Sequence, residues 1–259
     1  MDERLSEERK AMSGHSKWST IKRQKGATDA KRGQLFTKLA REITVAARSG
    51  LPDPESNPRL RIAVQKARAE NMPKDNIDRA IERAAGGAGA DNIDEIFYEG
   101  FGPGGIALMI QAMTDNRNRT VGEVRAVLTR AGGTLGENGS VSWMFDHVGH
   151  IVVEPGSLDP DEVALVAIDA GAADVQVEDE SVDIYTEMQE LHKVQDALTS
   201  AGIDVTSAEP AMRPKAPMAP DPDAAVKAIR LMERLEDLDD VQQVYSNLEV
   251  TDEVFAQVT

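Results

Sequence analysis

The apolar residues of this chain change their spacing at a glycine-rich connector over residues 86–92, and no other feature limits the possible folds as strongly. Before the connector, apolar side chains recur at the three- and four-residue steps of amphipathic helices. After it, short apolar runs typical of strands alternate with helical segments. The sequence therefore predicts an α+β protein in which a helical domain is followed by domains that contain sheets.

Three helices are expected before the connector. The first has an apolar stripe formed by Leu35, Leu39, Ile43 and Ala46. The second begins at Asn57-Pro58, because Asn is a strong N-cap and Pro is tolerated in the first turn of a helix. It ends before Pro73, and the third helix ends at Gly86. These three short helices predict a small bundle.

Two αβ domains are expected after the connector. Strands at 93–99 and 106–113, joined by a hairpin turn at 100–105, precede a helix that Thr120 would cap, and 140–145 is expected to be a further strand. Residues 149–207 then follow the order β-α-β-β-α-β of a ferredoxin-like unit. A proline-rich connection at 210–222, a helix and a strand complete the chain.

The final helix and strand lack partners nearby, so we expect the ferredoxin-like unit to be inserted into a middle domain. The predicted domains are listed in chain order: a flexible N-terminal extension at 1–11, a basic helical domain at 12–90, a middle αβ domain at 91–148 and 208–259, and the inserted ferredoxin-like αβ domain at 149–207.

Charge is divided unequally between these parts. The chain has 29 Lys and Arg against 45 Asp and Glu, a net charge of −16 that argues against binding to nucleic acid. Residues 12–85, however, hold 16 basic and 8 acidic side chains, a net charge of +8, whereas residues 86–259 have a net charge of −23. Such asymmetry indicates that one part alone contacts nucleic acid.

Several classes of protein are not supported. The chain has no cysteine, which fits a reducing cytoplasm and excludes disulfides and Cys-based zinc sites. It has no apolar run of membrane-spanning length and no secretory signal at its start. We therefore expect a cytoplasmic protein that does not bind membranes.

The basic charge is densest over residues 12–48, where 9 basic and 2 acidic side chains give a net charge of +7. Lys and Arg can neutralise phosphates, and Trp18 can stack on an unpaired base. On the first helix, Lys31, Lys38, Arg41 and Arg48 recur at steps of seven, three and seven residues and face away from the apolar stripe, and Lys38 and Arg41 are taken as candidates from this face. The alternative is that Trp18 packs on the bundle and the charges form a solvated face.

A second candidate is the segment 115–120, which contains two arginines in a domain that has few basic residues. Guanidinium groups beside a helix N-terminus suit phosphate. The alternative is a structural loop whose arginines pair with nearby carboxylates. The acidic cluster at 233–240 is expected to be a solvated surface.

Catalysis is poorly supported. His147 and His150, near Asp146, could form a weak metal pair, but spacing fixes no third ligand and a surface turn is the favoured interpretation. No nucleophile, base and orienting group can be read from the sequence. We therefore expect no enzyme activity, no cofactor and no small-molecule substrate.

Long motifs of this chain resemble the YebC/PmpR family from residue 12 to about residue 250. The motifs are GHSKWSTIKRQKGATDAKRGQLFTKLAREITVAARSG, NPRLRIAVQKARAENMPKDNIDRAIERAAGG, YEGFGPGGIAL, TDNRNRTVGEVR, GGTLGENGSVSWMF and LEDLDDVQQVY. The resemblance implies a helical N-terminal domain, a middle αβ domain and an inserted αβ domain. It also implies a cytoplasmic, DNA-binding regulator of transcription without catalytic residues or cofactors.

The resemblance implies nucleic-acid contact at several positions of the opening motif and, with less support, at the later arginine loop. The candidate nucleic-acid-binding residues, together with the two from the basic helix face, are Lys17, Trp18, Lys22, Arg23, Lys25, Lys31, Arg32, Lys38, Arg41, Asn116, Arg117, Asn118 and Arg119. The partner is expected to be promoter DNA or, alternatively, ribosomal RNA, because the family also includes a mitochondrial translational activator and members linked to ribosomes and to relief of stalling. A weaker alternative is an acidic module that binds other proteins.

Overall fold

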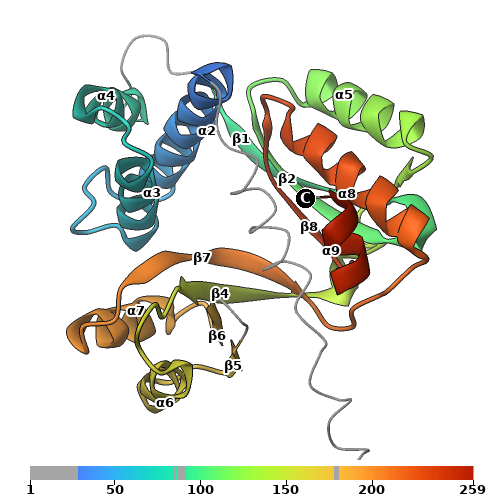
Figure 1. Ribbon diagram of the computed structural model, residues 1–259. Helices are drawn as coiled ribbons and strands as arrows, with labels where there is room; N and C mark the ends of the chain where they lie inside the picture. The colour runs from blue at the N-terminus through green and yellow to red at the C-terminus, as the bar shows by residue number, and fades with distance from the viewer. Residues whose placement is uncertain (1–28, 85, 87–91, 178–180, 259) are drawn as a thin grey trace, which may run out of the picture. The chain divides into compact units, whose positions relative to one another are not determined.

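The computed structural model describes residues 29–84, 86, 92–177 and 181–258, and it confirms the predicted α+β class (Figure 1). Within these ranges, three helices precede two antiparallel four-stranded sheets. The helices and most of the first sheet belong to one compact unit, Lys25–Ser142 with Val226–Val244, and the second sheet belongs to the other, which includes Trp143–Ala225 and Tyr245–Thr259. No helix of the described residues is long and apolar enough to cross a membrane.

The helical part contains α2 (Asp29–Arg48), α3 (Pro58–Ala69) and α4 (Lys74–Ala84). Their shared core includes the predicted apolar stripes, with Leu39, Ile43 and Leu60 almost fully buried. Asn57 is the N-cap of α3, as predicted, and its side-chain amide also donates to the carbonyl of Ala46 at 2.9 Å. The periodicity of the sequence therefore identified this bundle correctly.

The first sheet has the strand order β3-β1-β2-β8, and the helices α5 and α8 lie against it (Figure 1). Strands β1 and β2 form the predicted antiparallel hairpin, and a short 3₁₀-helix, η1 (Pro103–Gly105), lies in its turn. The bounds of the elements are β1 (Asp94–Phe101), β2 (Ala107–Thr114), α5 (Arg117–Arg130), β3 (Thr134–Leu135), α8 (Pro222–Glu236) and β8 (Val241–Ser246).

Two sequence predictions about this part were wrong. The N-cap of α5 is Asn116, whose side-chain oxygen accepts from the amide of Arg119 at 3.1 Å, whereas Thr120 lies inside the helix. The strand expected at 140–145 does not form, because a 3₁₀-helix, η2 (Ser142–Met144), lies there and only Phe145 belongs to a strand, the following β4. The carboxylate of Glu99 accepts hydrogen bonds from the amides of residues 139, 141 and 142, and these bonds replace a strand partner.

The second sheet follows the predicted order β-α-β-β-α-β. Its strand order β5-β6-β4-β7, with every pair antiparallel, is that of a ferredoxin-like unit. The bounds are β4 (Phe145–Val153), α6 (Pro160–Ala170), β5 (Asp174–Val177), β6 (Val182–Thr186), α7 (Leu191–Ser200) and β7 (Val205–Pro214). Strand β7 extends into the segment that was expected to be a connection.

The chain leaves the first sheet after β3, forms the second sheet, and contributes β8 to the first sheet afterwards. A last helix, α9 (Asp252–Val258), follows and was not expected from the sequence. The domain boundaries given above stay a prediction.

Candidate nucleic-acid interface

Part of the predicted interface cannot be placed. Lys17, Trp18, Lys22, Arg23 and Lys25 lie outside the described residues. Lys31 belongs to the first turn of α2, but its side chain is outside the described part of the chain as well. Arg32 is exposed on the same helix. The site must therefore be built from the remaining surface of the helical part.

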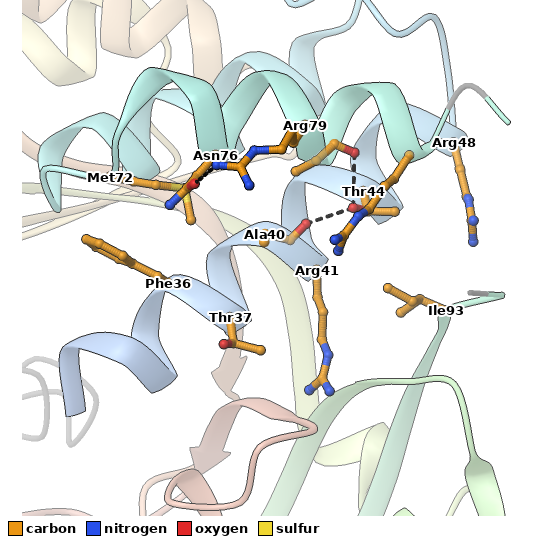
Figure 2. A pocket seen from close by; sticks show the side chains of 12 residues that line it. Phe36, Thr37, Ala40, Arg41, Thr44, Arg48, Met72, Asn76, Arg79 and Ile93 are labelled. Atoms are coloured by element: carbon orange, nitrogen blue, oxygen red, sulfur yellow. Dashed lines mark hydrogen bonds between the residues drawn. The ribbon is translucent and has the colours of Figure 1, made fainter. Parts of the chain in front are cut away.

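A cavity of about 380 Å³ lies along α2 and α4, and we call it the arginine groove (Figure 2). Four of its lining residues are arginines, five are apolar, and none of the twelve is acidic. The lining consists of Phe36, Thr37, Ala40, Arg41, Thr44, Arg48, Met72, Asn76, Arg79, Ala80, Arg83 and Ile93. A carboxylate-free cavity with four arginines is notable in a chain whose acidic residues outnumber its basic ones by 45 to 29.

Helical spacing brings the four arginines together. Arg41 and Arg48 are seven residues apart on α2, and Arg79 and Arg83 are four residues apart on α4, so each pair shares one helix face. Figure 2 shows Arg41 and Arg48 extending from the same side of α2, with Ile93 nearby. The contacts of α2 and α4 within the helical core hold both pairs against the same cavity.

Three of these arginines lack a carboxylate partner among the described residues. The side chains of Arg48 and Arg83 have no hydrogen-bond or ion-pair partner in that part of the chain, and the Nη1 atom of Arg48 is buried there without one. Arg79 donates only to neutral acceptors, the carbonyl of Asp75 at 3.0 Å and the side chain of Asn76 at 2.7 Å. Guanidinium groups without a carboxylate partner attract anions, because they form strong charge-assisted hydrogen bonds with phosphate.

Lys38 and Arg41, both predicted from the sequence, contact the turn between α8 and β8. Lys38 donates its ammonium protons to the carbonyl of Glu236, and Arg41 donates to the carbonyl of Asp239. The Nη1 atom of Arg41 is also 3.0 Å from Oδ1 of Asp240. Arg41 therefore lines the arginine groove while it holds a carboxylate, whereas Lys38 is directed at a main-chain acceptor.

The expectation that 233–240 is a solvated acidic surface was wrong for two residues, because Glu236 and Asp240 are both buried, and the side chain of Asp240 is only 2 % exposed. Its Oδ2 atom accepts from the hydroxyls of Thr114 at 3.0 Å and Thr120 at 2.6 Å, and from Nη2 of Arg119 at 2.7 Å. We call these four residues and Arg41 the Asp240 network. Burial raises the pKa of Asp240, but these hydrogen bonds and the charge of Arg41 together lower it by more. The pKa of Asp240 therefore lies below the ordinary value.

The arginine loop predicted from the sequence has partners within the protein. Arg119 bonds to Asp240 and also to Oδ1 of Asp115 at 2.7 Å, and these hydrogen bonds raise the pKa of its guanidinium. Asn116 caps α5. The arrangement matches the structural alternative for these two residues, and their contact with nucleic acid stays a prediction.

Arg117 and Asn118 occupy a different position. Both line a second, smaller cavity of about 270 Å³, together with Phe97 and Tyr98 of β1. Nε of Arg117 is 2.8 Å from Oδ2 of Asp94, so its charge is also paired. The loop therefore does not join the arginine groove.

The histidines considered for metal binding lie on strand β4, not in a surface turn. His150 is buried, and its Nε2 atom is 2.6 Å from Oδ1 of Asp183. Within the described ranges, no group of three or more His, Cys, Asp or Glu side chains could hold a metal ion.

Arg48, Arg79 and Arg83 were not among the predicted site residues. The spacing of the sequence places Arg48 on the basic face of the first helix with Arg41, although Arg48 is not one of the selected candidates, and the four-residue spacing of Arg79 and Arg83 could have identified those two. What the sequence could not show is that α2 and α4 turn these faces toward one cavity.

The fold and the groove define a class of protein in which a basic helical part precedes two antiparallel sheets, each packed with helices. The chain belongs to the TACO1/YebC family: the family's N-terminal domain matches residues 16–87, and its second and third domain matches residues 93–248.

Relatives with known sequences and structures are similar over nearly their whole length. A protein of Roseiflexus castenholzii, named a probable transcriptional regulatory protein, is 58% identical over 251 residues, which is 95% of this chain and 98% of the relative. A protein of Chloroflexus aggregans with the same name is 57% identical over 94% of this chain and 98% of its own length. The crystal structure of a conserved hypothetical protein from Aquifex aeolicus has a TM-score of 0.80 at 45% identity, covering 86% of this chain and 93% of that one.

Proposed function

We propose that this protein is a non-enzymatic regulator of gene expression that acts in the cytoplasm and binds nucleic acid through its helical part. The observation that carries the proposal is the arginine groove, in which Arg48, Arg79 and Arg83 lack a carboxylate partner among the described residues. The names of the relatives support a regulatory role, since they are described as probable transcriptional regulatory proteins.

The charge distribution explains how an acidic chain can bind a polyanion. Residues 12–85 have a net charge of +8 and residues 86–259 a net charge of −23, so the rest of the chain repels phosphate while the helical part attracts it. The predicted contacts at Lys17, Trp18, Lys22, Arg23 and Lys25 precede α2 in the chain and would add to the same basic part.

The test is a salt titration of binding by the full chain. Replacing Arg48, Arg79 and Arg83 together with Ala should weaken binding and flatten the log–log salt slope by about 2–3, because each phosphate contact contributes about 0.7–0.9. The matched control replaces three exposed arginines outside the groove, Arg125, Arg130 and Arg230, which removes the same charge. An unchanged slope in the groove variant would refute the proposal.

The same titration should use both of the partners that the sequence left open. Duplex DNA carrying promoter sequences and ribosomal RNA are titrated in parallel, and co-sedimentation with ribosomes is measured on the same preparation. Sequence-selective DNA binding at about 150 mM salt without co-sedimentation favours transcription, whereas the reverse favours translation.

A further inference from the structure

We infer that the arginine groove binds unpaired nucleotides of a single strand, in preference to the backbone of a duplex. This inference rests on the proposed function and specifies the ligand of the same site. A duplex can offer only its phosphates to a concave site, whereas a single strand can offer both phosphates and free base faces.

The groove is large enough for more than phosphate contacts. Its volume of about 380 Å³ falls within the range of about 300–1,000 Å³ that is typical of small-molecule sites, so it has room for a nucleobase. Its α2 wall runs from Phe36 to Arg48, a length of about 18 Å at 1.5 Å per residue. Stacked nucleotides rise by about 3.4 Å each, so several fit along this wall.

The chemistry of the lining changes along the groove. Phe36 and Met72 form an apolar region, and Figure 2 shows them at the opposite end of the labelled group from Arg48. Phe36 is only partly buried against the helical core, so its ring is available for stacking. Thr37 and Asn76 add hydrogen-bonding groups beside this region, of the kind that base edges use.

A single strand matches this order of apolar, polar and cationic groups along the groove. Its phosphates suit the guanidinium groups of Arg48 and Arg83, and its bases can stack on Phe36, as aromatic side chains do in proteins that bind single strands. A base in a duplex reaches such a surface only after it is unstacked and unpaired, which costs a few kcal/mol. The groove should therefore discriminate against duplexes.

The experiment measures fluorescence anisotropy of the full chain with a labelled 15-nucleotide strand of mixed sequence and with the matching duplex. DNA and RNA versions of both are used, so that the two backbones are compared separately. We expect each strand to bind at least about tenfold more tightly than its duplex. The inference is supported whether this difference is larger for DNA or for RNA. Equal binding of strand and duplex would overturn it.

A second measurement isolates the stacking surface. Phe36→Leu keeps an apolar side chain against the core but removes the aromatic face, so it should weaken strand binding by about fivefold or more and leave duplex binding unchanged. The control is Phe101→Leu, a half-buried phenylalanine of β1 that does not line the groove. Thermal unfolding of both variants checks that they are folded. Unchanged strand binding by folded Phe36→Leu overturns the inference.

Failure of this inference can be told apart from failure of the proposed function. If strand and duplex bind equally and the triple replacement of Arg48, Arg79 and Arg83 weakens both, the groove binds phosphate only and the proposed function stands. If no strand, duplex or ribosomal RNA binds, both are overturned.

Discussion

The arginine groove and the Asp240 network both collect arginines at helix surfaces, but different groups face the guanidiniums. In the network, Arg119 bonds to Asp240 and Asp115, and the carboxylate of Asp240 is almost fully buried. In the groove, the guanidinium groups of Arg48 and Arg83 have no partner among the described residues. An arginine-rich motif therefore reveals its role only through the groups around it.

Arg41 belongs to both regions, since it lines the groove and lies 3.0 Å from Oδ1 of Asp240. The network thereby fixes the orientation of one groove residue while it joins α2 to the end of β2 and the start of α5. The network therefore stabilises the fold, whereas Arg48, Arg79 and Arg83 in the groove keep positive charge that an anionic ligand can neutralise.

The largest expected effect comes from removing the buried charge of the network. Asp240→Asn should lower the free energy of unfolding by about 2–3 kcal/mol, because Arg119 and Arg41 lose their shared carboxylate. This loss is smaller than the loss of about 3–5 kcal/mol that is typical of a broken buried pair, because the Arg119 side chain is 41% exposed. Urea unfolding at pH 7 measures the loss, and the exposed Asp237→Asn is the control, with a change within about 0.5 kcal/mol. Equal midpoints for the two variants would contradict the assigned role.

The next prediction separates the two regions directly. Arg119→Met should lower the free energy of unfolding by about 1–2 kcal/mol and leave nucleic-acid affinity unchanged. Arg83→Met should do the reverse: a stability change within about 0.5 kcal/mol, about fivefold weaker binding, and a salt slope shallower by about 0.7–0.9. Urea unfolding and salt-dependent anisotropy measure both. Weaker binding by a stable Arg119→Met protein would instead support the nucleic-acid role predicted for the loop.

Much of the fold could be predicted because it depends on local signals. The stripe that contains Leu39 and Ile43, and the cap at Asn57, follow from helical period and side-chain chemistry. The cap of α5 was misassigned because Asn116 and Thr120 are both good cap residues four positions apart. Only the fold shows that the Thr120 hydroxyl donates to Asp240, which is 120 residues away in the sequence.

The site was less predictable for the same reason. The sequence indicated a basic helical part, yet Lys38 and Arg41 contact the turn that follows α8, about 200 residues away. In the sequence, Arg79 and Arg83 look like part of an ordinary charged helix face. Only the packing of α4 against α2 places them beside the groove. Charge counts identify the part of the chain that binds, but tertiary packing decides which cations are neutralised.

Glu99, a second buried carboxylate, makes a related prediction about pH dependence. Burial raises the pKa of Glu99, but the hydrogen bonds from the backbone amides of Gly139, Val141 and Ser142 together lower it by more. The net shift is therefore downward from the ordinary value of 4.5. A lowered pKa stabilises the fold above pH 4.5, and this contribution is lost as the pH falls through the pKa of the folded state. Glu99→Gln should therefore cost about 1–2 kcal/mol at pH 7 and less at pH 3, as measured by urea unfolding.

The control for this pH dependence is Glu137→Gln, an exposed carboxylate in the same loop region. Its difference from the wild type should be small and should not change with pH. If the gap between wild type and Glu99→Gln stays constant from pH 7 to pH 3, the carboxylate does not carry the hydrogen bonds to the loop in its charged form.

The smallest effect tests the comparison within one helix, because Lys38→Met and Arg48→Met each remove one positive charge from α2. At about 150 mM salt, where charges more than about 8 Å apart are largely screened, only a cation next to phosphate should matter. Arg48→Met should weaken binding by about fivefold, and Lys38→Met by less than about twofold, because its ammonium donates to the carbonyl of Glu236. Anisotropy titrations of the two variants measure this difference. Equal weakening would show that net charge, and not the lack of a partner, determines which arginines and lysines bind the ligand.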